Sequence, residues 1–374
     1  MTSHTSGHPG GHPGGPPPGA QDGAPPLRLV AWETTRRCNL SCLHCRAGAE
    51  DHHYPGELTT AQGEAFLTDL ATLGQPVVIL TGGEPLLRPD IFHLARFGTD
   101  LGLRMVMAPN GTLLTPEAAE RLVEAGIARI SISLDGPDSA SHDAFRGQAG
   151  AFAGAMNGIA AATAAGLEFQ VNTTVTRSNL GQMQAIQELA AAKGAVAHHI
   201  FLLVPTGRGR ALTGEIITAE EYEDVLNWFY DQRDQVDMEL KATCAPHYYR
   251  VLRQRAKVEG RKVEFATEGL AAVTRGCLGG IGFAFVSHVG RVQPCGYLEK
   301  SAGNLTEAPF SDIWRDSELF RRLRDYDQLQ GKCGICEYRK VCGGCRARAY
   351  EVSGDEMAEE PLCTYQPGRA GKKP

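Results

Sequence analysis

The chain has no large excess of charge of either sign: 37 lysine and arginine residues against 43 aspartate and glutamate residues give a formal net charge of −6. A mildly acidic chain offers no general attraction for nucleic acid or anionic lipid, so neither is expected as a partner. Long hydrophobic runs are also missing, and no segment approaches the roughly 18–20 apolar residues that span a bilayer. Since the N-terminus lacks the hydrophobic core of a secretory signal, we expect a cytoplasmic protein.

Apolar residues are almost absent from residues 1–26, which consist largely of Gly, Pro and His. Such a segment buries too little surface to order, so we predict a disordered tail. The remainder of the 374 residues is long enough for one large α/β domain and a smaller one. The predicted divisions are a tail over 1–26, a barrel domain over 27–215, bridging helices over 216–270, a cluster-binding domain over 271–366 and a second tail over 367–374.

Eleven cysteines without an export signal indicate metal or redox use in a reducing compartment, not disulfides. Three of them, Cys38, Cys42 and Cys45, lie within eight residues, directly after an apolar run that predicts a strand. A loop with three thiolates can bind three corners of a cubic iron–sulfur cluster and leave the fourth iron open. The spacing alone also fits a structural zinc loop or buried free thiols.

Short apolar strands alternate with amphipathic helices from residue 27 to about 205. Helix starts are marked by capping-box spacing at Thr59 and Gln62 and by Thr115 before a proline, and a further helix by Thr218 and Glu221. Six βα repeats with short links predict parallel strands, right-handed crossovers and a partial (β/α)6 barrel of the TIM-like α/β class, open on one side. The predicted strands are 27–34, 77–81, 103–108, 128–134, 167–175 and 199–204, and the helices between them are 60–73, 89–99, 116–125, 150–165 and 180–192.

The cysteine loop resembles the CxxxCxxC loop of radical SAM enzymes, with His44 as the aromatic residue before the last cysteine. In that family the three cysteines, here Cys38, Cys42 and Cys45, bind a [4Fe-4S] cluster. S-adenosylmethionine (SAM) then chelates the open iron through its amino and carboxylate groups. Active sites of such barrels lie at the carboxyl ends of the strands, which is where this loop follows the first strand.

The resemblance implies further SAM contacts at the other strand ends. Gly82, Gly83 and Glu84 follow the second strand and resemble the motif that receives the methionyl amino group. By the same resemblance Ser133 and Asp135, at the end of the fourth strand, would bind the ribose, although Asp135 also fits as the cap of the following helix. The remaining expected SAM contacts are Asn110, Arg146, Asn172 and Leu203.

Seven more cysteines lie near the C-terminus. A hairpin is predicted over 283–293, between the first two of them. Their packed spacing fits a zinc ribbon, but it more closely resembles the SPASM extension of radical SAM enzymes, which binds auxiliary iron–sulfur clusters. The pattern implies one complete outer auxiliary cluster and three corners of an inner one. The eighth cysteine usual in that family is absent, so the inner cluster has an open iron, a non-cysteine ligand, or Cys244, unless only one auxiliary cluster forms. The outer ligands would be Cys333, Cys336, Cys342 and Cys363, and the inner ligands Cys277, Cys295 and Cys345.

Three segments, 243–250, 276–280 and 292–298, resemble the haem-biosynthesis branch of this family, which contains AhbD-type haem b synthases and NirJ enzymes. The AhbD-type reading implies a radical SAM oxidative decarboxylase that converts two propionates of iron-coproporphyrin III to vinyls and yields haem b. An auxiliary cluster would carry away the surplus electron, and a ferredoxin or flavodoxin-type protein would be the electron donor. The alternatives are a NirJ-type enzyme of haem d1 formation, a SPASM peptide maturase, and a non-enzymatic iron–sulfur electron carrier.

A substrate with four propionates needs local positive charge in an acidic protein. Arg208 and Arg210 follow the sixth strand, and Arg250 follows a His-Tyr-Tyr motif. His247 is the candidate axial ligand to the substrate iron, because neutral imidazole suits iron, and Tyr248 is a candidate proton donor. Each of these residues also has an ordinary alternative: surface arginines, an interior histidine and a packed tyrosine.

Overall fold

The computed structural model of the chain describes residues 23–264 and 275–368. Most of the predicted tails (1–22 and 369–374) and residues 271–274 of the predicted cluster-binding domain lie outside these ranges. Residues 23–26, which we expected to belong to the disordered tail, are packed instead. Ala24 is buried, and the Trp314 indole Nε1 donates a hydrogen bond of 3.0 Å to the Pro25 carbonyl. The packed chain therefore begins before the predicted boundary.

The described residues contain one ten-stranded sheet in the order β10-β9-β8-β1-β2-β3-β4-β5-β6-β7, and strands β1 to β7 pair in parallel. The predicted α/β class and its six parallel strands are confirmed, and the sheet is open. Strand β7 beside β6 was missed, and so was the parallel pairing of β8 with β1. The strands are β1 Leu29–Thr35, β2 Val77–Gly82, β3 Arg104–Met107, β4 Ile130–Ser133, β5 Phe169–Val175, β6 Ala197–Leu202, β7 Glu239–Thr243, β8 Phe283–Val286, β9 Arg291–Gln293 and β10 Gly303–Asn304.

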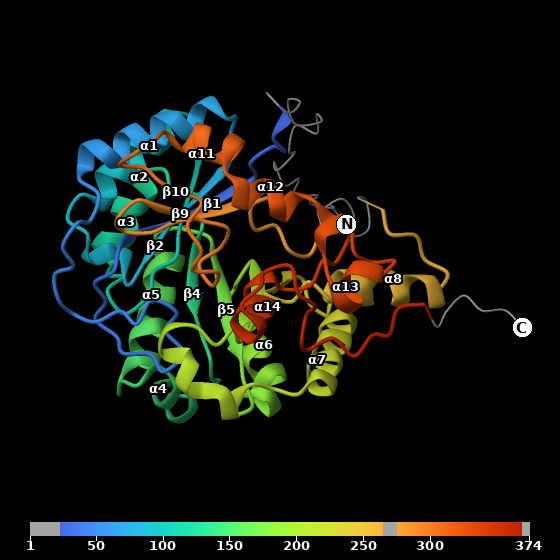
Figure 1. Cartoon of the computed structure of the whole chain (residues 1–374). Helices are drawn as coiled ribbons and strands as arrows, with labels where there is room; N and C mark the ends of the chain where they lie inside the picture. The colour runs from blue at the N-terminus through green and yellow to red at the C-terminus, as the bar shows by residue number, and fades with distance from the viewer. Residues whose placement is uncertain (1–22, 265–274, 369–374) are drawn as a thin grey trace, which may run out of the picture.

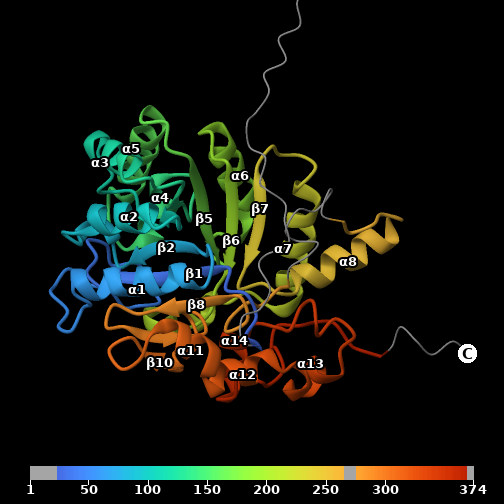
Figure 2. The same cartoon turned by 90° about the horizontal axis from the view of Figure 1, so that it is seen from above.

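Helices connect the parallel strands and cover one side of the sheet (Figures 1 and 2). The capping box of Thr59 and Gln62 and the Thr115 cap are present as predicted. Among the α-helices that connect β1 to β6, α4 was missed; Asp138 caps it and Gly147 ends it in a left-handed conformation. The first helices are α1 Thr60–Thr72, η2 Pro85–Leu87, α2 Ile91–Asp100, α3 Pro116–Glu124, α4 Ser139–Arg146, α5 Ala151–Ala164, η3 Leu180–Gln182 and α6 Met183–Ala192.

The C-terminal part packs on the same sheet. The predicted hairpin is confirmed as β8 and β9, which pair antiparallel. Helix α11 lies against α1, with the Phe310 and Phe66 rings 5.6 Å apart. Helix α14 lies at the carboxyl ends of β6 and β7, where Arg348 Nη2 donates to the Cys244 carbonyl at 3.1 Å. The remaining helices are η4 Gly207–Glu215, α7 Ala219–Gln232, α8 Tyr248–Val258, α11 Phe310–Asp316, α12 Glu318–Arg324, η5 Tyr326–Gln328, α13 Gly331–Ile335 and α14 Arg346–Ser353.

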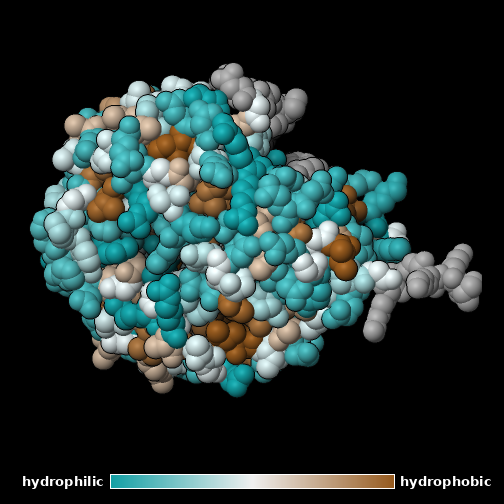
Figure 3. Space-filling model, viewed as in Figure 1, coloured by the Kyte–Doolittle hydropathy of each residue, from teal (hydrophilic) through white to brown (hydrophobic). Residues whose placement is uncertain are grey.

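The surface is mainly polar on the face seen in Figure 1, with several separate hydrophobic patches (Figure 3). A search of the described ranges for a helix with the length and apolar content of a membrane span finds none.

Glu33, on β1, is fully buried and joins three parts of the chain. Its carboxylate accepts a hydrogen bond from Arg46 Nη2 in the cysteine loop at 3.2 Å, and His288 Nδ1 in the β8–β9 turn lies 3.0 Å away. Burial by itself would raise the pKa of Glu33, but the Arg46 charge, the His288 hydrogen bond and Arg36 outweigh it and lower the pKa to about 2. The carboxylate is therefore ionised at neutral pH and ties the loop and the turn to the sheet.

We expect Glu33→Gln to lower the free energy of unfolding at pH 7 by about 3 kcal/mol, because the pKa lies well below its ordinary value. A depressed folded-state pKa contributes stability above the unfolded value near 4.5, and this stability is lost as the pH falls toward 2. Urea unfolding followed by tryptophan fluorescence measures the difference. The exposed Glu124→Gln in α3 serves as control; equal effects of the two substitutions would contradict the assignment.

Candidate active site

The cysteine loop connects β1 to α1 and contains three sulfur atoms that each accept a hydrogen bond. Leu40 N donates to Cys38 Sγ and Ala49 N to Cys45 Sγ, both at 3.4 Å, and Arg146 Nη1 lies 3.6 Å from Cys42 Sγ. Cys38 and Cys42 are buried, and Cys45 is half-buried. Donors directed at sulfur favour the thiolate over the thiol. The loop therefore presents three sulfurs in surroundings that suit metal ligands.

Arg208 holds this loop from outside. Its Nε donates to the Cys42 carbonyl and its Nη1 to the Ala49 carbonyl, each at 2.9 Å, and its backbone N–H donates to the Cys45 carbonyl at 3.0 Å. Gly207 has a φ of 54°, and a Cβ there would lie 2.1 Å from the Arg46 carbonyl. The side chain that we expected to pair with a propionate thus bonds to the loop backbone.

The glycine motif after β2 packs directly on the start of the loop. A Cβ on Gly82 would lie 2.4 Å from the Thr35 carbonyl, and one on Gly83 would lie 2.3 Å from the Arg37 carbonyl. Only glycine permits this approach. The motif therefore forms a close-fitting backbone surface beside the cysteines.

Glu84 is fully buried next to these glycines and is linked to the loop through asparagines. Its carboxylate accepts hydrogen bonds from Leu86 N at 3.0 Å and Asn110 N at 2.7 Å, and Asn110 Nδ2 donates to Asn39 Oδ1 at 2.8 Å. Burial raises the pKa of Glu84 to about 7, although both backbone hydrogen bonds lower it. A bound ammonium group would favour the ionised carboxylate. The sequence analysis did not identify Asn39 as a site residue, because only its contact with Asn110 in the folded chain connects it to Glu84.

Ser133 and Asn172 are brought together, since they are paired across β4 and β5. Asn172 Oδ1 accepts a hydrogen bond from Gln170 Nε2 at 2.9 Å. Leu203 is buried directly after β6. His44 stacks on Phe145 with ring centroids 4.3 Å apart, and burial lowers the pKa of His44 to about 4, so its ring is neutral at pH 7.

Asp135 and Arg146 form a close buried ion pair with each other. Asp135 Oδ1 also accepts a hydrogen bond from Thr174 N at 2.7 Å. Burial would raise the pKa of Asp135, but Arg146 keeps it below the ordinary value. The alternative in which Asp135 caps the next helix is wrong, because Asp138 is the cap of α4. Arg146 thus connects Asp135 to Cys42.

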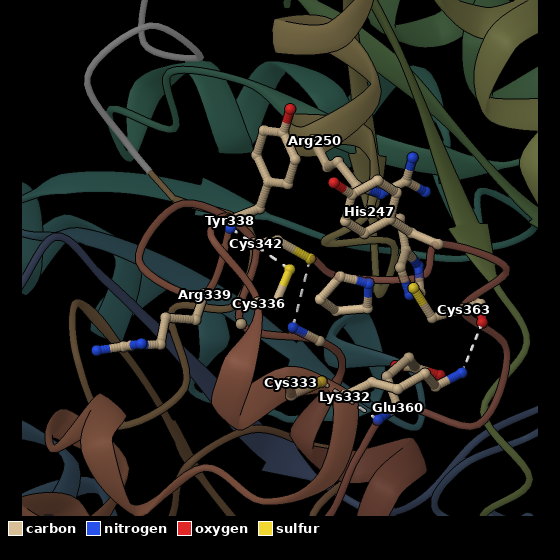
Figure 4. Close-up of a pocket in the computed structure, with 14 residues that line it drawn as sticks. His247, Arg250, Lys332, Cys333, Cys336, Tyr338, Arg339, Cys342, Glu360 and Cys363 are labelled. Carbon is tan, nitrogen blue, oxygen red and sulfur yellow. Dashed lines mark hydrogen bonds between the residues drawn. The ribbon is translucent and has the colours of Figure 1, made fainter. Parts of the chain in front are cut away.

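The four expected outer cysteines line one small pocket between α8 and the C-terminal segment (Figure 4). Three of their sulfurs accept backbone hydrogen bonds: Cys333 from Glu360 at 3.4 Å, Cys336 from Tyr338 at 3.4 Å and Cys342 from Gly344 at 3.5 Å. His247 and Arg250 complete part of the wall (Figure 4). This pocket has the donor chemistry of a thiolate-bound cluster.

A second buried group contains Cys295 and Cys345 with Leu298. Cys345 follows Cys342 after Gly343 and Gly344, whose φ values of 75° and 65° are left-handed. Two such glycines turn the chain sharply, so the two cysteines face different groups. The two residues between Cys342 and Cys345 are therefore glycines that permit this turn.

All eleven cysteines lie in the described ranges, and all are free. Burial raises the pKa of Cys38 to about 12 and of Cys345 to about 11, so a metal must replace the proton before either thiol ionises at neutral pH. Within residues 23–264 and 275–368, no three Cys, His, Asp or Glu residues converge as the ligands of one metal ion do. The thiolates of a four-iron cluster bind different iron atoms.

The five expected substrate contacts do not share a pocket in the described structure. Arg208 holds the loop, whereas Arg210 is exposed and pairs with Glu351 at 3.3 Å. Buried Arg250 donates to Glu223 at 2.9 Å. The His247 side chain is buried beside the outer cysteines, and neither of its ring nitrogens has a hydrogen-bond partner among the described residues. Tyr248 packs in the core near Phe229.

A basic pocket was missed by sequence reasoning. It has a volume of about 390 Å³, and none of its described lining residues is acidic. Its wall includes residues next to Cys277 and Cys342. The pocket lies where β1 and β8 begin, at the opposite end of β1 from the cysteine loop. Its charged residues come from four separate segments of the chain, so no local sequence motif could have predicted the pocket. They are Arg28, Arg253, Arg275 and Lys340.

Comparison with known proteins agrees with this architecture. Residues 32–190 match the model of the radical SAM superfamily, and residues 277–346 match the SPASM iron–sulfur cluster-binding domain. The chain is 58% identical over 348 residues, 93% of this chain and 95% of the relative, to the AdoMet-dependent heme synthase of Nitratidesulfovibrio vulgaris. It is 32% identical to the pre-heme d1 synthase of Dinoroseobacter shibae, over 92% of this chain and 88% of that protein.

A solved structure, Streptococcus suis SuiB bound to S-adenosylmethionine, superposes with a TM-score of 0.69. The match covers 91% of this chain and 78% of SuiB, at 17% identity. A likeness at this identity shows the shared fold.

We expect Arg208→Ala to reduce the iron bound by the cysteine loop and, in parallel, 5′-deoxyadenosine formation, because three hydrogen bonds to the loop originate at this residue. Iron and sulfide analysis with product chromatography measures both. Arg210→Ala, which removes an exposed ion pair two residues away, should leave them unchanged. Full iron content in Arg208→Ala, with loss confined to tetrapyrrole binding, would restore the propionate assignment.

Proposed function

The chain belongs to the radical SAM superfamily, in the branch of the AdoMet-dependent haem synthases, and we propose that it converts iron-coproporphyrin III to haem b. The proposed reaction removes one β-hydrogen atom and one CO2 from each of two propionates and leaves two vinyl groups. Each decarboxylation also releases one electron. The chain spans 95% of the relative that carries this name, so both the barrel and the C-terminal domain are represented.

The observation that carries the proposal is the cysteine loop at the carboxyl end of β1, with three sulfurs that each accept a hydrogen bond. We infer that Cys38, Cys42 and Cys45 hold a [4Fe-4S] cluster with one open iron. When SAM is bound there, it supplies a carbon radical strong enough to remove an unactivated hydrogen atom. No acid or base on the protein can perform that step.

The residues around the loop fit the binding of SAM. Glu84, buried beside the loop, is the proposed acceptor of the methionyl ammonium, and Gly82 and Gly83 would allow the backbone to approach the ligand. Ser133 and Asn172 stand side by side as candidate ribose partners. Asp135 and Arg146 neutralise each other, so we assign this pair to holding Cys42 in place.

The C-terminal cysteines supply a route for the released electrons. Their two groups lie on either side of the turn formed by Gly343 and Gly344. Iron–sulfur clusters in both groups would accept one electron at a time. The expected roles of Arg250 and His247 at the substrate are replaced by a role at the outer cluster, because both line its pocket.

A pre-haem d1 synthase is the second candidate function, since that relative shares both domains over 88% of its length. The higher identity to the haem synthase, 58% against 32%, favours the first. A peptide maturase is the remaining alternative: SuiB, which has also been solved bound to the precursor peptide SuiA, shares the fold, but at only 16% sequence identity.

The basic pocket suits an acidic electron carrier of the ferredoxin or flavodoxin type as partner. Arg28, Arg253, Arg275 and Lys340 line it, beside the chain that leads to Cys277 and Cys342. Opposite charges steer association and make its rate depend on salt. A carrier bound here would exchange electrons with the auxiliary clusters.

Anaerobic incubation of the reduced protein with SAM and iron-coproporphyrin III tests the proposed function. We expect a product lighter by two CO2 and four hydrogens, namely one β-hydrogen and one carboxylic proton for each propionic acid. Mass spectrometry detects this loss, and the product should show a haem b absorbance spectrum. Cys38→Ala should form no product, because the cluster loses a ligand. Formation of 5′-deoxyadenosine without any decarboxylated porphyrin would reject haem b synthesis and leave the pre-haem d1 alternative.

Lys340→Glu tests the carrier site. Lys340 is exposed, so we expect little effect on folding, but a several-fold higher KM for a reduced ferredoxin because a like charge now faces the acidic carrier. Dithionite needs no docking surface and should support unchanged turnover. The exposed Lys193→Glu, directly after α6, is the matched charge control. An unchanged KM for the carrier would contradict this site.

A further inference from the structure

Cys244 lies directly after β7, 33 residues before the part of the chain that matches the iron–sulfur cluster-binding domain. Among residues 23–264 and 275–368 it is the single non-glycine residue with a positive φ, 55°. Such a conformation persists only where the surroundings enforce it. Here the Cys244 carbonyl accepts hydrogen bonds from the Tyr222 hydroxyl and from Arg348 Nη2, both at 3.1 Å.

The side chain of Cys244 packs in the second buried group, with Cys295 and Cys345. Cys277 lies beside this group, since its backbone N–H donates a hydrogen bond of 3.3 Å to the carbonyl of Cys342, three residues before Cys345. Cys277, Cys295 and Cys345 are the three cysteines that the sequence pattern assigns to the inner cluster. Cys244, Cys295 and Cys345 therefore pack in one group, and Cys277 lies beside it, although the four residues come from four separate segments of the chain.

We propose that Cys244 is the fourth thiolate ligand of the inner auxiliary cluster, together with Cys277, Cys295 and Cys345. This deepens the proposed function, on which it rests for the presence of the cluster. The eleven cysteines then divide into a set of three and two sets of four. Because all four irons of the inner cluster are bound by protein, none is free to bind the tetrapyrrole. The inner cluster therefore transfers electrons, and the open iron of the cysteine loop is the one site for an external ligand.

Two tyrosines also pack in this group, Tyr297 and Tyr350, and a phenol could serve as an oxygen ligand. Tyr297 is half-buried against Cys295 and Cys345, and Cys244 is among the charges that raise the pKa of its phenol, after burial itself. A phenol ionises less readily than a thiol, so the cysteine is the better ligand. Tyr297→Phe removes only the hydroxyl group and is the matched control for Cys244.

The experiment uses the full-length reconstituted protein with Cys38, Cys42 and Cys45 all changed to alanine, so that only the auxiliary clusters contribute. We expect cyanide to leave the EPR spectrum of this parent unchanged, because both auxiliary clusters are fully ligated. Addition of Cys244→Ala should then either remove about half of the iron and sulfide or retain a cluster whose spectrum now responds to cyanide. Cys244→Ser, which keeps a ligand atom, should retain the iron with altered g-values. Circular dichroism verifies folding of each variant.

The opposite pattern would overturn the inference: a parent spectrum that responds to cyanide, and a Cys244→Ala variant with unchanged iron and unchanged spectrum. A change caused by Tyr297→Phe but not by Cys244→Ala would instead identify the phenol as ligand. No tetrapyrrole is present in these measurements. Failure here with normal haem b formation by the wild type would therefore reject the ligand and leave the proposed function intact.

Discussion

Burial of cysteine thiols is the constraint on which the rest of the structure depends. A buried thiol resists ionisation, as the raised pKa values of Cys38 and Cys345 show. The fold offsets this cost with donors directed at sulfur and with an arginine at each group. Arg146 reaches Cys42 Sγ, and Arg346 Nη2 lies 3.7 Å from Cys333 Sγ. At the inner group, Arg348 contacts the Cys244 carbonyl.

All three arginines are buried: Arg346 donates to the carbonyls of Glu356 and Ala358, and the other two pair with acids. Arg146 pairs with Asp135, and Arg348 pairs with Glu360 at 3.1 Å. Glu360 also accepts a hydrogen bond from Cys345 N at 2.7 Å. Removal of one member of such a pair leaves an uncompensated buried charge, which is strongly destabilising. The cysteine groups thus depend on the buried arginines, and the arginines depend on their buried partners. This dependence explains why charged residues lie in the interior, where apolar residues are usual.

The sequence predicted what short-range patterns determine. The spacing of Cys38, Cys42 and Cys45, the capping box at Thr59 and the β8–β9 hairpin all depend on neighbours a few residues apart. Strand β7 was missed because only one of its five residues, Ala242, is buried. The contacts of Arg208 join residues 166 and 159 positions away, so no local pattern could distinguish a loop clamp from a propionate partner.

The parallel strands β1 to β7 and the C-terminal part of the chain from β8 onward share one sheet. Strand β8 pairs with β1 along four residues, and Glu33 bonds to both the loop and the β8–β9 turn. Residues far apart in sequence therefore meet in the two cysteine groups through a shared backbone frame. Long-range pairing of this kind is set by packing and cannot be read from periodicity.

The Cys342-Gly343-Gly344-Cys345 turn joins the outer and inner groups by two glycines only, and Cys244 and His247, three residues apart, join them again at the start of α8. Two short covalent bridges leave no slack between the groups. Electron tunnelling falls off steeply with separation, so a fixed gap keeps its rate steady while the rest of the molecule fluctuates. In this protein the distance between the outer and inner auxiliary clusters would be set by these two short segments of the chain.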